Sequence, residues 1–232
     1  IVEQEEALGT ADAALQAREK IDDRALIMNG DDIYPGLPDL SAHSSCLLGM
    51  EVDEPSKFGI YQIEDGRVKD IEEKPENPSS AMANIGLYLV GSEFFDLLDD
   101  VEMSERGEYE ITDAVKEYVG SEQVDFQEAR RWLPCSYPDQ LMDANLELLE
   151  EIETATDGDM KNSETGGTVI IEEDARVENS ELTNVVIHSG ATVRDCKLEN
   201  VVVREDSTLQ DVETSRSYYM PGCPEAEKVE NV

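Results

Sequence analysis

A short apolar run that ends in two acids is the first segment of this sequence with an evident capacity for chemistry. Residues 24–29 are mostly apolar, and Gly30, Asp31 and Asp32 follow them directly. A run of this kind is typical of a buried parallel strand, and open α/β sheets bind ligands at the carboxyl ends of such strands. Asp31 could there hold a hard divalent cation. Alternatively, Asp31 or Asp32 simply caps the turn before Pro35.

A second polar group lies further along the chain. Glu72, Glu73 and Lys74 form a charged segment, and an apolar run that starts at Asn84 follows it. A carboxylate accepts hydrogen bonds from hydroxyls, an ammonium neutralises anions, and an amide both donates and accepts. Lys74 stands out because the chain has only 18 Lys and Arg residues. A surface ion pair among these three residues would give the same pattern.

Together with the N-terminal segment, these motifs resemble the sugar-1-phosphate nucleotidyltransferases, in particular the glucose-1-phosphate thymidylyl- and uridylyltransferases. Enzymes of this family join a sugar phosphate to a nucleotide and release pyrophosphate. The resemblance covers roughly residues 3–216, with Glu72–Pro75 and the following Asn84-x-Gly86 strand as its strongest local signature. It implies an α/β fold built on a Rossmann-like nucleotidyltransferase domain.

The resemblance implies a nucleotide subsite at the N-terminal end. Gln4, Gly9 and Thr10 would bind the nucleotide, because an amide side chain and backbone groups can pair with the edges of uracil or thymine and glycine permits close approach. Without the resemblance, Gly9 and Thr10 predict only a loop and an N-cap. Asp31 would be catalytic by holding a Mg²⁺ ion that bridges the phosphates.

A sugar subsite is implied on the other motifs. Gly59 matches a position where the backbone closes over the sugar, Glu73 would accept from the sugar hydroxyls, and Asn84 would add a further sugar contact. Lys74 would be catalytic through its contact with the sugar phosphate. The substrates would be a nucleoside triphosphate and a sugar 1-phosphate.

Two departures from the family pattern affect this expectation. The glycine-rich phosphate loop that opens the family's fold, with its arginine and lysine, is not found in the 232 residues. Pro134 stands where many members place a second metal-binding aspartate, and Asp139 lies just beyond Pro138. We therefore expect an N-terminally truncated, incomplete domain that is inactive as an isolated chain, because losing a preorganised cationic group typically costs about 10²–10³ in rate.

The composition is strongly acidic. The chain has 55 Asp and Glu residues against 18 Lys and Arg, a formal net charge of −37. Acids spread over an ordinary apolar pattern are typical of halophilic proteins, in which high salt screens the repulsion. We expect a haloarchaeal type of protein in a salt-rich cytoplasm, and the charge argues against nucleic acid or an anionic membrane as a partner. The four cysteines are widely spaced, which favours free thiols over a zinc site or disulfides.

The spacing of apolar residues predicts the order of elements. A helix is expected over residues 11–20, strands over 24–29, 45–52 and 84–90, a hairpin over 58–71 with Asp65 and Gly66 at its turn, and helices over 92–98, 109–119 and 140–152. The last helix would close a nucleotidyltransferase-like domain of residues 1–153. Polar residues 154–167 would form a linker.

An internal repeat with a period of sixteen residues follows. Apolar residues recur in register in three copies over residues 168–216: Ile171, Ile187 and Val203; Val177, Val193 and Leu209; Leu182, Leu198 and, more loosely, Val212. This register predicts three triangular coils of a β-solenoid, which resembles the left-handed β-helix appended to several nucleotidyltransferases. A three-stranded meander is the alternative. Residues 217–232 would form a C-terminal tail.

Two functions of different classes remain open at this point. One is a sugar nucleotidyltransferase that acts on glucose 1-phosphate with dTTP or UTP. The other is a non-catalytic regulatory or assembly subunit that pairs with a full-length homologue, so we expect either a homo-oligomer or such a pairing. An acyltransferase site in the β-helix is disfavoured, because His188 is the only histidine of the repeat. His43 lies in a loop with no evident partner in the sequence.

Overall fold

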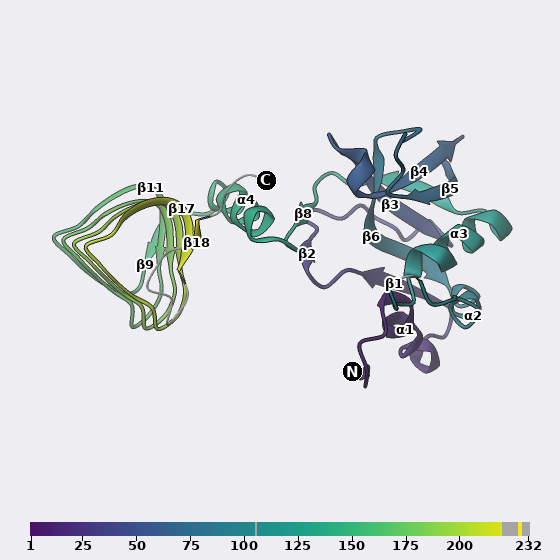
Figure 1. The fold of residues 1–232 in the computed structure, drawn as a ribbon, viewed down its shortest axis with the longest axis horizontal. Coiled ribbons are helices and arrows are strands. Elements are labelled where there is room, and N and C mark those ends of the chain that lie inside the picture. Colours follow the sequence, from purple (N-terminus) through teal and green to yellow (C-terminus); the bar gives the residue numbers. More distant parts are fainter. Residues whose placement is uncertain (105, 220–226, 229–232) are drawn as a thin grey trace. The chain divides into compact units, whose positions relative to one another are not determined.

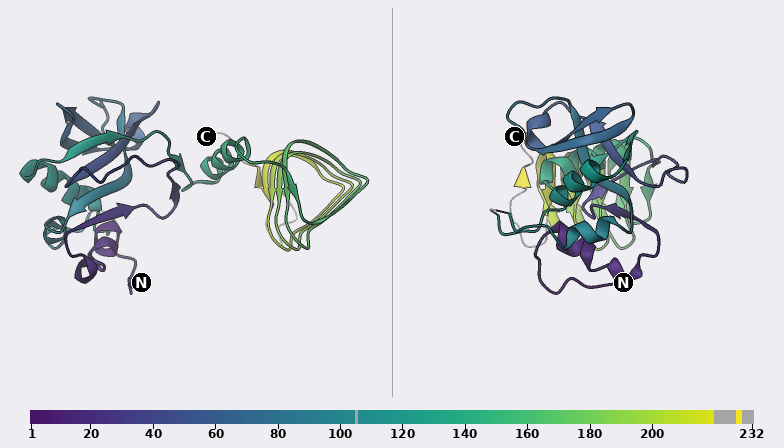
Figure 2. Two further views of the ribbon diagram at one scale, coloured as in Figure 1. Left: turned by 180° about the vertical axis from the view of Figure 1, so that it is seen from behind. Right: turned by 90° about the vertical axis from the view of Figure 1, so that its right-hand side faces the viewer.

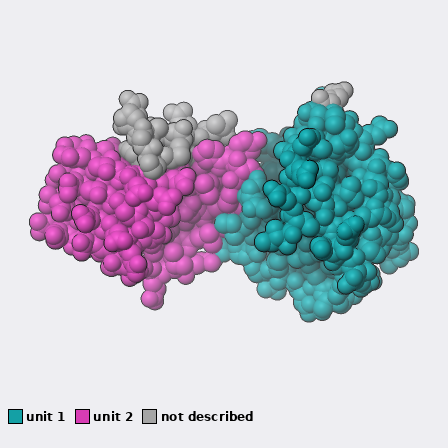
Figure 3. Space-filling view, turned by 90° about the horizontal axis from the view of Figure 1, so that it is seen from below, with its two compact units in different colours: residues 1–132 teal, residues 133–232 magenta. Residues whose placement is uncertain are grey.

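The computed structural model describes residues 1–104, 106–219 and 227–228. It divides the chain into two compact units, residues 1–132 and 133–232 (Figure 3). Each unit has its own buried apolar clusters. No helix among the described residues is both long enough and apolar enough to cross a lipid bilayer.

Unit 1 is built on a mixed sheet whose strand order is β1–β6–β3–β7–β5–β4 (Figure 1). Its strands are β1 (Arg24–Met28), β3 (Cys46–Glu51), β4 (Gly59–Glu64), β5 (Arg67–Glu73), β6 (Met82–Gly91) and β7 (Asp125–Glu128), and the short β2 (Asp32–Ile33) follows β1. The pair β3–β7 is parallel, whereas β1 and β3 both run antiparallel to β6. The α/β class expected from the sequence is confirmed.

Helices cover one face of this sheet. They are α1 (Thr10–Leu15), η1 (Arg18–Lys20), α2 (Phe94–Leu98) and α3 (Ile111–Ser121), and a further short turn, η2 (Pro55–Lys57), precedes β4. Buried side chains of α2 and α3 meet Tyr88 and Val90 of β6 in the larger cluster of the unit. On the opposite face, Leu87 and Leu89 belong to a cluster with Tyr34, and Trp132 packs against this cluster. Alternate residues of β6 therefore serve two cores, which explains its continuous apolar sequence.

The hairpin predicted from the Asp-Gly dipeptide is confirmed. Strands β4 and β5 pair antiparallel on either side of Asp65 and Gly66, which both have positive φ, 51° and 73°. Two consecutive left-handed residues make the tight hairpin turn that Asp-Gly favours. The hairpin aligns Gly59 directly opposite Glu73 at its open end.

The strand predicted over residues 24–29 differs from expectation. We expected it to be buried and parallel, but β1 pairs antiparallel with β6 and lies at the edge of the sheet. Its side chains alternate between exposed and half-buried positions, because successive side chains of a strand point to opposite faces of the sheet. Leu26 and Met28 remain 44% and 45% exposed.

Unit 2 contains stacked coils of parallel strands, which have a triangular outline in the left view of Figure 2. One sheet has the order β18–β17–β15–β13–β11–β9 and another the order β10–β12–β14–β16. The strands are β8 (Leu133–Pro134), β9 (Ala155–Thr156), β10 (Asp159–Lys161), β11 (Glu164–Ile171), β12 (Arg176–Glu178), β13 (Glu181–Ile187), β14 (Thr192–Arg194), β15 (Lys197–Val203), β16 (Thr208–Gln210), β17 (Glu213–Tyr219) and β18 (Glu227–Lys228). The result is a β-helix of about four coils.

The sixteen-residue register predicted for the repeat is confirmed. Val185 of β13 pairs with Val201 of β15, and Val193 of β14 with Leu209 of β16. The predicted inward columns form one buried cluster, to which Val212 is a half-buried neighbour. Parallel pairing between successive copies excludes a meander, whose strands would alternate in direction.

The boundary between the compact units lies after Trp132. Helix α4 (Pro138–Leu149) packs on the solenoid through Met142 and Leu149, which meet Val186 and Val202. Residues 154–167, expected to be a linker, contain β9, β10 and the start of β11. Their polarity reflects exposed side chains on a first coil, where backbone pairing with β11 and β12 sets the structure.

The predicted C-terminal tail is partly ordered. Residues 217–219 complete β17, and Glu227–Lys228 pair antiparallel with it as β18. The rest of the predicted tail, which includes Cys223, lies outside the described residues. Cys46, Cys135 and Cys196 are free thiols.

Candidate functional site

The three residues predicted to bind a nucleotide lie together at the start of α1. The Gln4 amide donates to the Gly9 carbonyl over 3.2 Å and to the Asp12 carboxylate over 2.6 Å. Gly9 has φ 114°, and a Cβ at this position would lie 2.5 Å from the Tyr109 carbonyl oxygen. Glycine is therefore required here by the close approach of another backbone segment.

Thr10 has a different partner from the one expected. It does not cap α1, whose N-cap is Gly9. Its hydroxyl instead accepts a hydrogen bond from the backbone N–H of Ile111, 3.1 Å away, at the first turn of α3. The residue satisfies a donor at a helix start, but of a helix about a hundred residues away in sequence. This contact joins the Gly9–Thr10 loop to α3.

The three predicted sugar-binding residues are also brought together. Gly59 and Glu73 are paired across the β4–β5 hairpin, and Asn84 lies on the neighbouring strand β6. A Cβ on Gly59 would lie 3.0 Å from a Glu73 carboxylate oxygen and 3.6 Å from the Asn84 Cβ. The absence of a side chain at Gly59 thus leaves room for the carboxylate and the amide to lie side by side.

Asn84 is fixed by a hydrogen-bond network that the sequence did not reveal. Its Oδ1 accepts from the Tyr61 hydroxyl over 2.9 Å, and its Nδ2 donates to the Tyr88 hydroxyl over 2.8 Å. The backbone N–H of Gly86 donates to the same Oδ1. An amide with both ends engaged has a defined orientation. The alternation of Asn84, Gly86 and Tyr88 along one strand is the signal that could have indicated this network.

Gly86 shapes the strand between Asn84 and Tyr88. The β3–β6 register shifts at this point, and Gly86 has φ 68°, as expected for a β-bulge that requires glycine. A Cβ there would lie 2.1 Å from the Asn29 side-chain nitrogen. The bulge lets Asn29, just after β1, lie against β6, and its backbone N–H donates to the Gly86 carbonyl.

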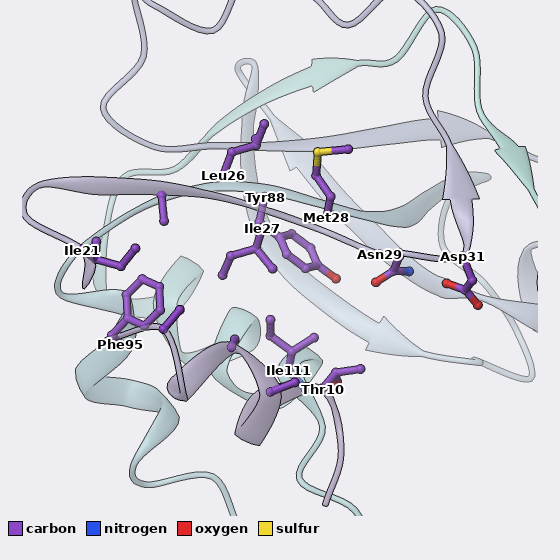
Figure 4. Close-up of a pocket in the computed structure, with 15 residues that line it drawn as sticks. Thr10, Ile21, Leu26, Ile27, Met28, Asn29, Asp31, Tyr88, Phe95 and Ile111 are labelled. Carbon is purple, nitrogen blue, oxygen red and sulfur yellow. Dashed lines mark hydrogen bonds between the residues drawn. The ribbon is translucent and has the colours of Figure 1, made fainter. Parts of the chain in front are cut away.

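A cavity of about 470 Å³ opens between β1 and α1. Figure 4 shows Thr10, Asn29 and Asp31 at one end of it and Ile21 and Phe95 at the other. Tyr88 also lines the cavity. Because the Tyr88 hydroxyl accepts from Asn84, this side chain links the Gly59–Glu73–Asn84 group to the cavity that holds Asp31. Tyr88 therefore contacts both the cavity and the second group of predicted site residues.

Lys74 lies beside the predicted sugar-binding residues but does not line this cavity. Its Nζ is 4.0 Å from a Glu73 carboxylate oxygen, and its backbone N–H donates to the Phe58 carbonyl. Lys74 has φ 43°, a left-handed conformation that costs a residue with a side chain about 1–3 kcal/mol. The structure at the end of the hairpin keeps Lys74 in this strained conformation. The Lys74 ammonium therefore stays next to Glu73.

Burial dominates the electrostatics of the group. Partial burial raises the pKa of the Glu73 carboxyl, with nearby Lys74 lowering it and Glu110 raising it. Burial also raises the pKa of the Tyr88 hydroxyl to about 12, while the Asn84 hydrogen bond opposes the shift and the Glu73 charge adds to it. Tyr88 is thus a neutral hydrogen-bonding group at neutral pH.

The donor set at Asp31 fits a magnesium ion that is carried mainly by phosphates. The described residues contain no cluster of three or more His, Cys, Asp or Glu side chains able to enclose a metal. Mg²⁺ is typically bound by one or two carboxylates together with substrate phosphates and water, and Asp31 at the polar end of the cavity supplies such a carboxylate. Asp139, the acid that follows Pro134 and Pro138 in the sequence, lies in the first turn of α4 in unit 2.

The histidines have partners that the sequence did not indicate. His43 Nδ1 lies 2.8 Å from an Asp125 carboxylate oxygen, and its Nε2 lies 3.1 Å from the Gln127 amide. No partner of His43 was evident in the sequence; the pairing arises because Asp125 and Gln127 lie on β7, next to the loop. His188 is half exposed and contacts Glu172 on the preceding coil. Neither histidine lines the cavity.

Comparison with known proteins identifies a family of which this chain is a member. Residues 1–151 match the family model described as nucleotidyl transferase. The chain is 35% identical over 178 residues to the bifunctional protein GlmU of Methanocaldococcus jannaschii, a match that covers 75% of this chain and 44% of the relative. It is 30% identical over 194 residues to the glucose-1-phosphate thymidylyltransferase of Streptomyces antibioticus, covering 78% of this chain and 54% of that protein.

A solved structure has the same fold over most of the matched region. The protein is described as a glucose-1-phosphate thymidylyltransferase from Bacillus anthracis, with 29% identity and a TM-score of 0.55 over 66% of this chain and 65% of that one. The chain thus spans about half the length of the curated relatives.

Proposed function

Because the chain belongs to the nucleotidyl transferase family, we propose that unit 1 is a sugar-1-phosphate nucleotidyltransferase domain. The substrates would be glucose 1-phosphate and dTTP or UTP. An oxygen of the sugar phosphate attacks the α-phosphorus of the nucleotide, a new P–O bond forms, and the bond to the β-phosphate oxygen breaks to release pyrophosphate. Such transfers depend mainly on positioning and charge neutralisation.

Each group of site residues has a place in this reaction. Gln4, Gly9 and Thr10 bind the nucleotide. Asp31 would hold Mg²⁺, which would supply charge neutralisation at the phosphates. Lys74 holds the sugar phosphate.

Gly59, Glu73 and Asn84 bind the sugar. The single observation that carries the proposal is the convergence of Gly59, Glu73 and Asn84, with Asn84 donating to Tyr88, a residue that also lines the cavity of Asp31. A carboxylate beside an oriented amide is suited to a ligand with several hydroxyls.

We further propose that this chain binds its substrates but is inactive as an isolated chain. The residues that line the cavity include no Lys or Arg. The charge on the transferring phosphates is then offset by the metal and by Lys74 alone, although preorganised cations account for a large share of the rate in such reactions.

The test measures binding and turnover separately. Calorimetry in molar KCl with Mg²⁺ should detect binding of glucose 1-phosphate and of dTTP or UTP to the full chain, and a pyrophosphate-release assay should detect no turnover. Asp31→Asn should weaken nucleotide binding in the presence of Mg²⁺, and Asn84→Ala should weaken sugar phosphate binding. His188→Gln, a change on the β-helix, is the matched control and should alter neither. Absence of binding by any sugar phosphate and nucleotide pair would refute the proposal.

A regulatory or assembly subunit is the alternative in this family. It would bind a full-length homologue, and the same calorimetry would then register the homologue but no sugar phosphate. A cytoplasmic location and association into oligomers are further parts of the proposal, to be tested by fractionation and by light scattering in high salt.

A further inference from the structure

The orientation of the Asn84 amide is determined by a backbone group. The Gly86 N–H lies 2.9 Å from one end of this amide, and a backbone N–H can only donate, so that end is the oxygen Oδ1. The Tyr61 hydroxyl lies 2.9 Å from the same oxygen. Nδ2 is therefore the end that faces Tyr88, whose hydroxyl is 2.8 Å away.

This orientation leaves one hydrogen-bonding group of Asn84 for a ligand. An amide oxygen accepts two hydrogen bonds, and Tyr61 and Gly86 supply both. Of the two N–H groups on Nδ2, one donates to Tyr88, and the second has no acceptor among the residues that the structure describes. Asn84 is only half-buried. It therefore presents a single N–H donor.

Tyr61 is a buried support beneath this amide. Its exposed fraction is 0%, and its ring packs edge-on against Phe126 with a centroid distance of 6.1 Å. Gly49 makes room for the ring, because a Cβ there would lie 3.2 Å from a Tyr61 ring carbon. A phenylalanine would fill the same space without burying a hydroxyl, which costs free energy unless it is hydrogen-bonded. Packing alone therefore does not explain the hydroxyl.

The Tyr61 hydroxyl is a permanent donor to Asn84. Burial raises the pKa of this hydroxyl well above its ordinary value, so the group stays protonated in neutral and mildly basic solution. Its hydrogen bond reaches Oδ1 from a different side chain than the Gly86 N–H does. Without Tyr61, one contact alone would hold Oδ1, and the amide could turn about that contact.

The Glu73 carboxylate complements the donor of Asn84. Both lie next to Gly59, where a Cβ would be 3.0 Å from a Glu73 carboxylate oxygen and 3.6 Å from the Asn84 Cβ. An ionised carboxylate only accepts, whereas the free group of Asn84 only donates. A hydroxyl both donates and accepts, so the hydroxyls of a sugar ring can satisfy both side chains.

We propose that Tyr61 is a positioning residue of the sugar subsite. Its hydroxyl orients the Asn84 amide so that one N–H of Nδ2 donates to the oxygen of a ring hydroxyl on the sugar phosphate, beside the accepting carboxylate of Glu73. This inference rests on the proposed function and deepens it, because it names the residue that orients the amide.

The test measures glucose 1-phosphate binding to the full chain by calorimetry in molar KCl with Mg²⁺. Tyr61→Phe removes only the hydroxyl and keeps the ring. It should weaken glucose 1-phosphate binding about three- to tenfold, the range expected for one hydrogen bond, and leave dTTP binding unchanged. Tyr118→Phe is the matched control, because it removes another buried hydroxyl of unit 1, which donates to Glu93. It should change neither affinity.

A double-mutant cycle separates positioning from a general structural role. If Tyr61 acts through Asn84, Tyr61→Phe should change the affinity less than about twofold when Asn84→Ala is already present, since two residues of one network are not additive. Losses that multiply in the double variant would overturn the proposal. An equal loss of glucose 1-phosphate and dTTP binding in Tyr61→Phe would also overturn it, because that pattern indicates damage to the whole unit.

Nuclear magnetic resonance of the ¹⁵N-labelled wild type tests the same claim without a variant. Glucose 1-phosphate should shift one Asn84 Nδ2 proton more than the other, because the other is bonded to Tyr88. Saturable sugar phosphate binding without such a shift would overturn the role of Tyr61 and leave the proposed function intact. Absence of sugar phosphate binding by the wild type would refute the proposed function, and the positioning role with it.

Discussion

At the scale of single residues, the candidate site combines groups held by geometry with groups tuned by burial. Tyr61 and Tyr88 fix both ends of the Asn84 amide, and Gly86 is required by its positive φ and the close approach of the Asn29 side chain. Glu73 is unusual because partial burial raises the pKa of its carboxyl although Lys74 lies nearby and lowers it. A group placed at some cost to stability is expected at functional sites.

Replacing Glu73 with glutamine should stabilise the fold while weakening sugar phosphate binding. Burial raises the pKa of the folded-state carboxyl above its ordinary value of 4.5. The folded protein then binds more protons than the unfolded chain between the two values, so the unfolding free energy falls as pH rises through this window. Urea unfolding from about pH 4 to 7 should show this fall in the wild type and a smaller one in Glu73→Gln.

The matched control is Glu72→Gln, which removes the same charge from an exposed neighbour. The Glu73 carboxylate is 41% exposed, so solvent screening keeps its effect small. An identical pH dependence for the wild type and Glu73→Gln would contradict this account of Glu73.

At the scale of elements, contacts between distant segments decide the arrangement. Thr10 joins the first loop to α3, and the bulge at Gly86 brings Asn29 against β6. Helix α4 follows unit 1 in sequence but packs on the β-helix, where Met142 and Leu149 meet Val186 and Val202. Asn145 and Asp143 of α4 add polar contacts to Tyr218 and Arg216 of β17. The helix therefore belongs to the β-helix as a structural unit.

Truncation of Met142 should destabilise the β-helix. The side chain is fully buried, so Met142→Ala should cost about 2–5 kcal/mol. Hydrogen exchange should become faster in β13 and β15, on which α4 packs, and should stay unchanged in the β4–β5 hairpin of unit 1. The exposed neighbour Leu141, 38% exposed, provides the control variant Leu141→Ala with a much smaller effect. Faster exchange in the hairpin alone would show that α4 supports unit 1 instead.

At the scale of the whole molecule, charge is the dominant property. A net charge of −37 on 232 residues opposes compaction through self-repulsion. Several cationic side chains form ion pairs, such as Arg216 with Asp143 and Arg194 with Glu178. In each unit a separate apolar cluster opposes this repulsion. Screening of the charges by salt is therefore expected to stabilise both units.

Salt should therefore raise the thermal stability of the chain strongly. Screening shortens the Debye length from about 10 Å at 0.1 M to about 3 Å at 1 M, so the midpoint temperature should rise most steeply below about 1 M KCl. Differential scanning calorimetry over a KCl series measures this. Glycerol at equal osmolality is the control and should give a smaller rise. A midpoint that is independent of KCl would refute a salt-dependent fold.

The sequence by itself determined the features that depend on local pattern. The sixteen-residue period gave the inward columns of the β-helix, because stacked coils repeat the same apolar face. The Asp65–Gly66 dipeptide gave the hairpin, because few residues other than glycine and aspartate adopt its turn. The order of Gln4, Asp31, Glu73 and Asn84 indicated the family, because these motifs can be recognised in the sequence without knowing which contacts the residues make.

Only the tertiary structure decided which elements become neighbours. An apolar run such as Arg24–Met28 has the same pattern whether its strand is parallel and central or antiparallel and at an edge, since pattern records burial and not partners. The polar residues 154–167 resembled a linker because the first coil exposes its side chains while its backbone pairs. The Tyr61–Asn84–Tyr88 network and the cavity beside Asp31 arise from side chains that meet only when the sheet has formed, and no spacing in the sequence specifies that meeting.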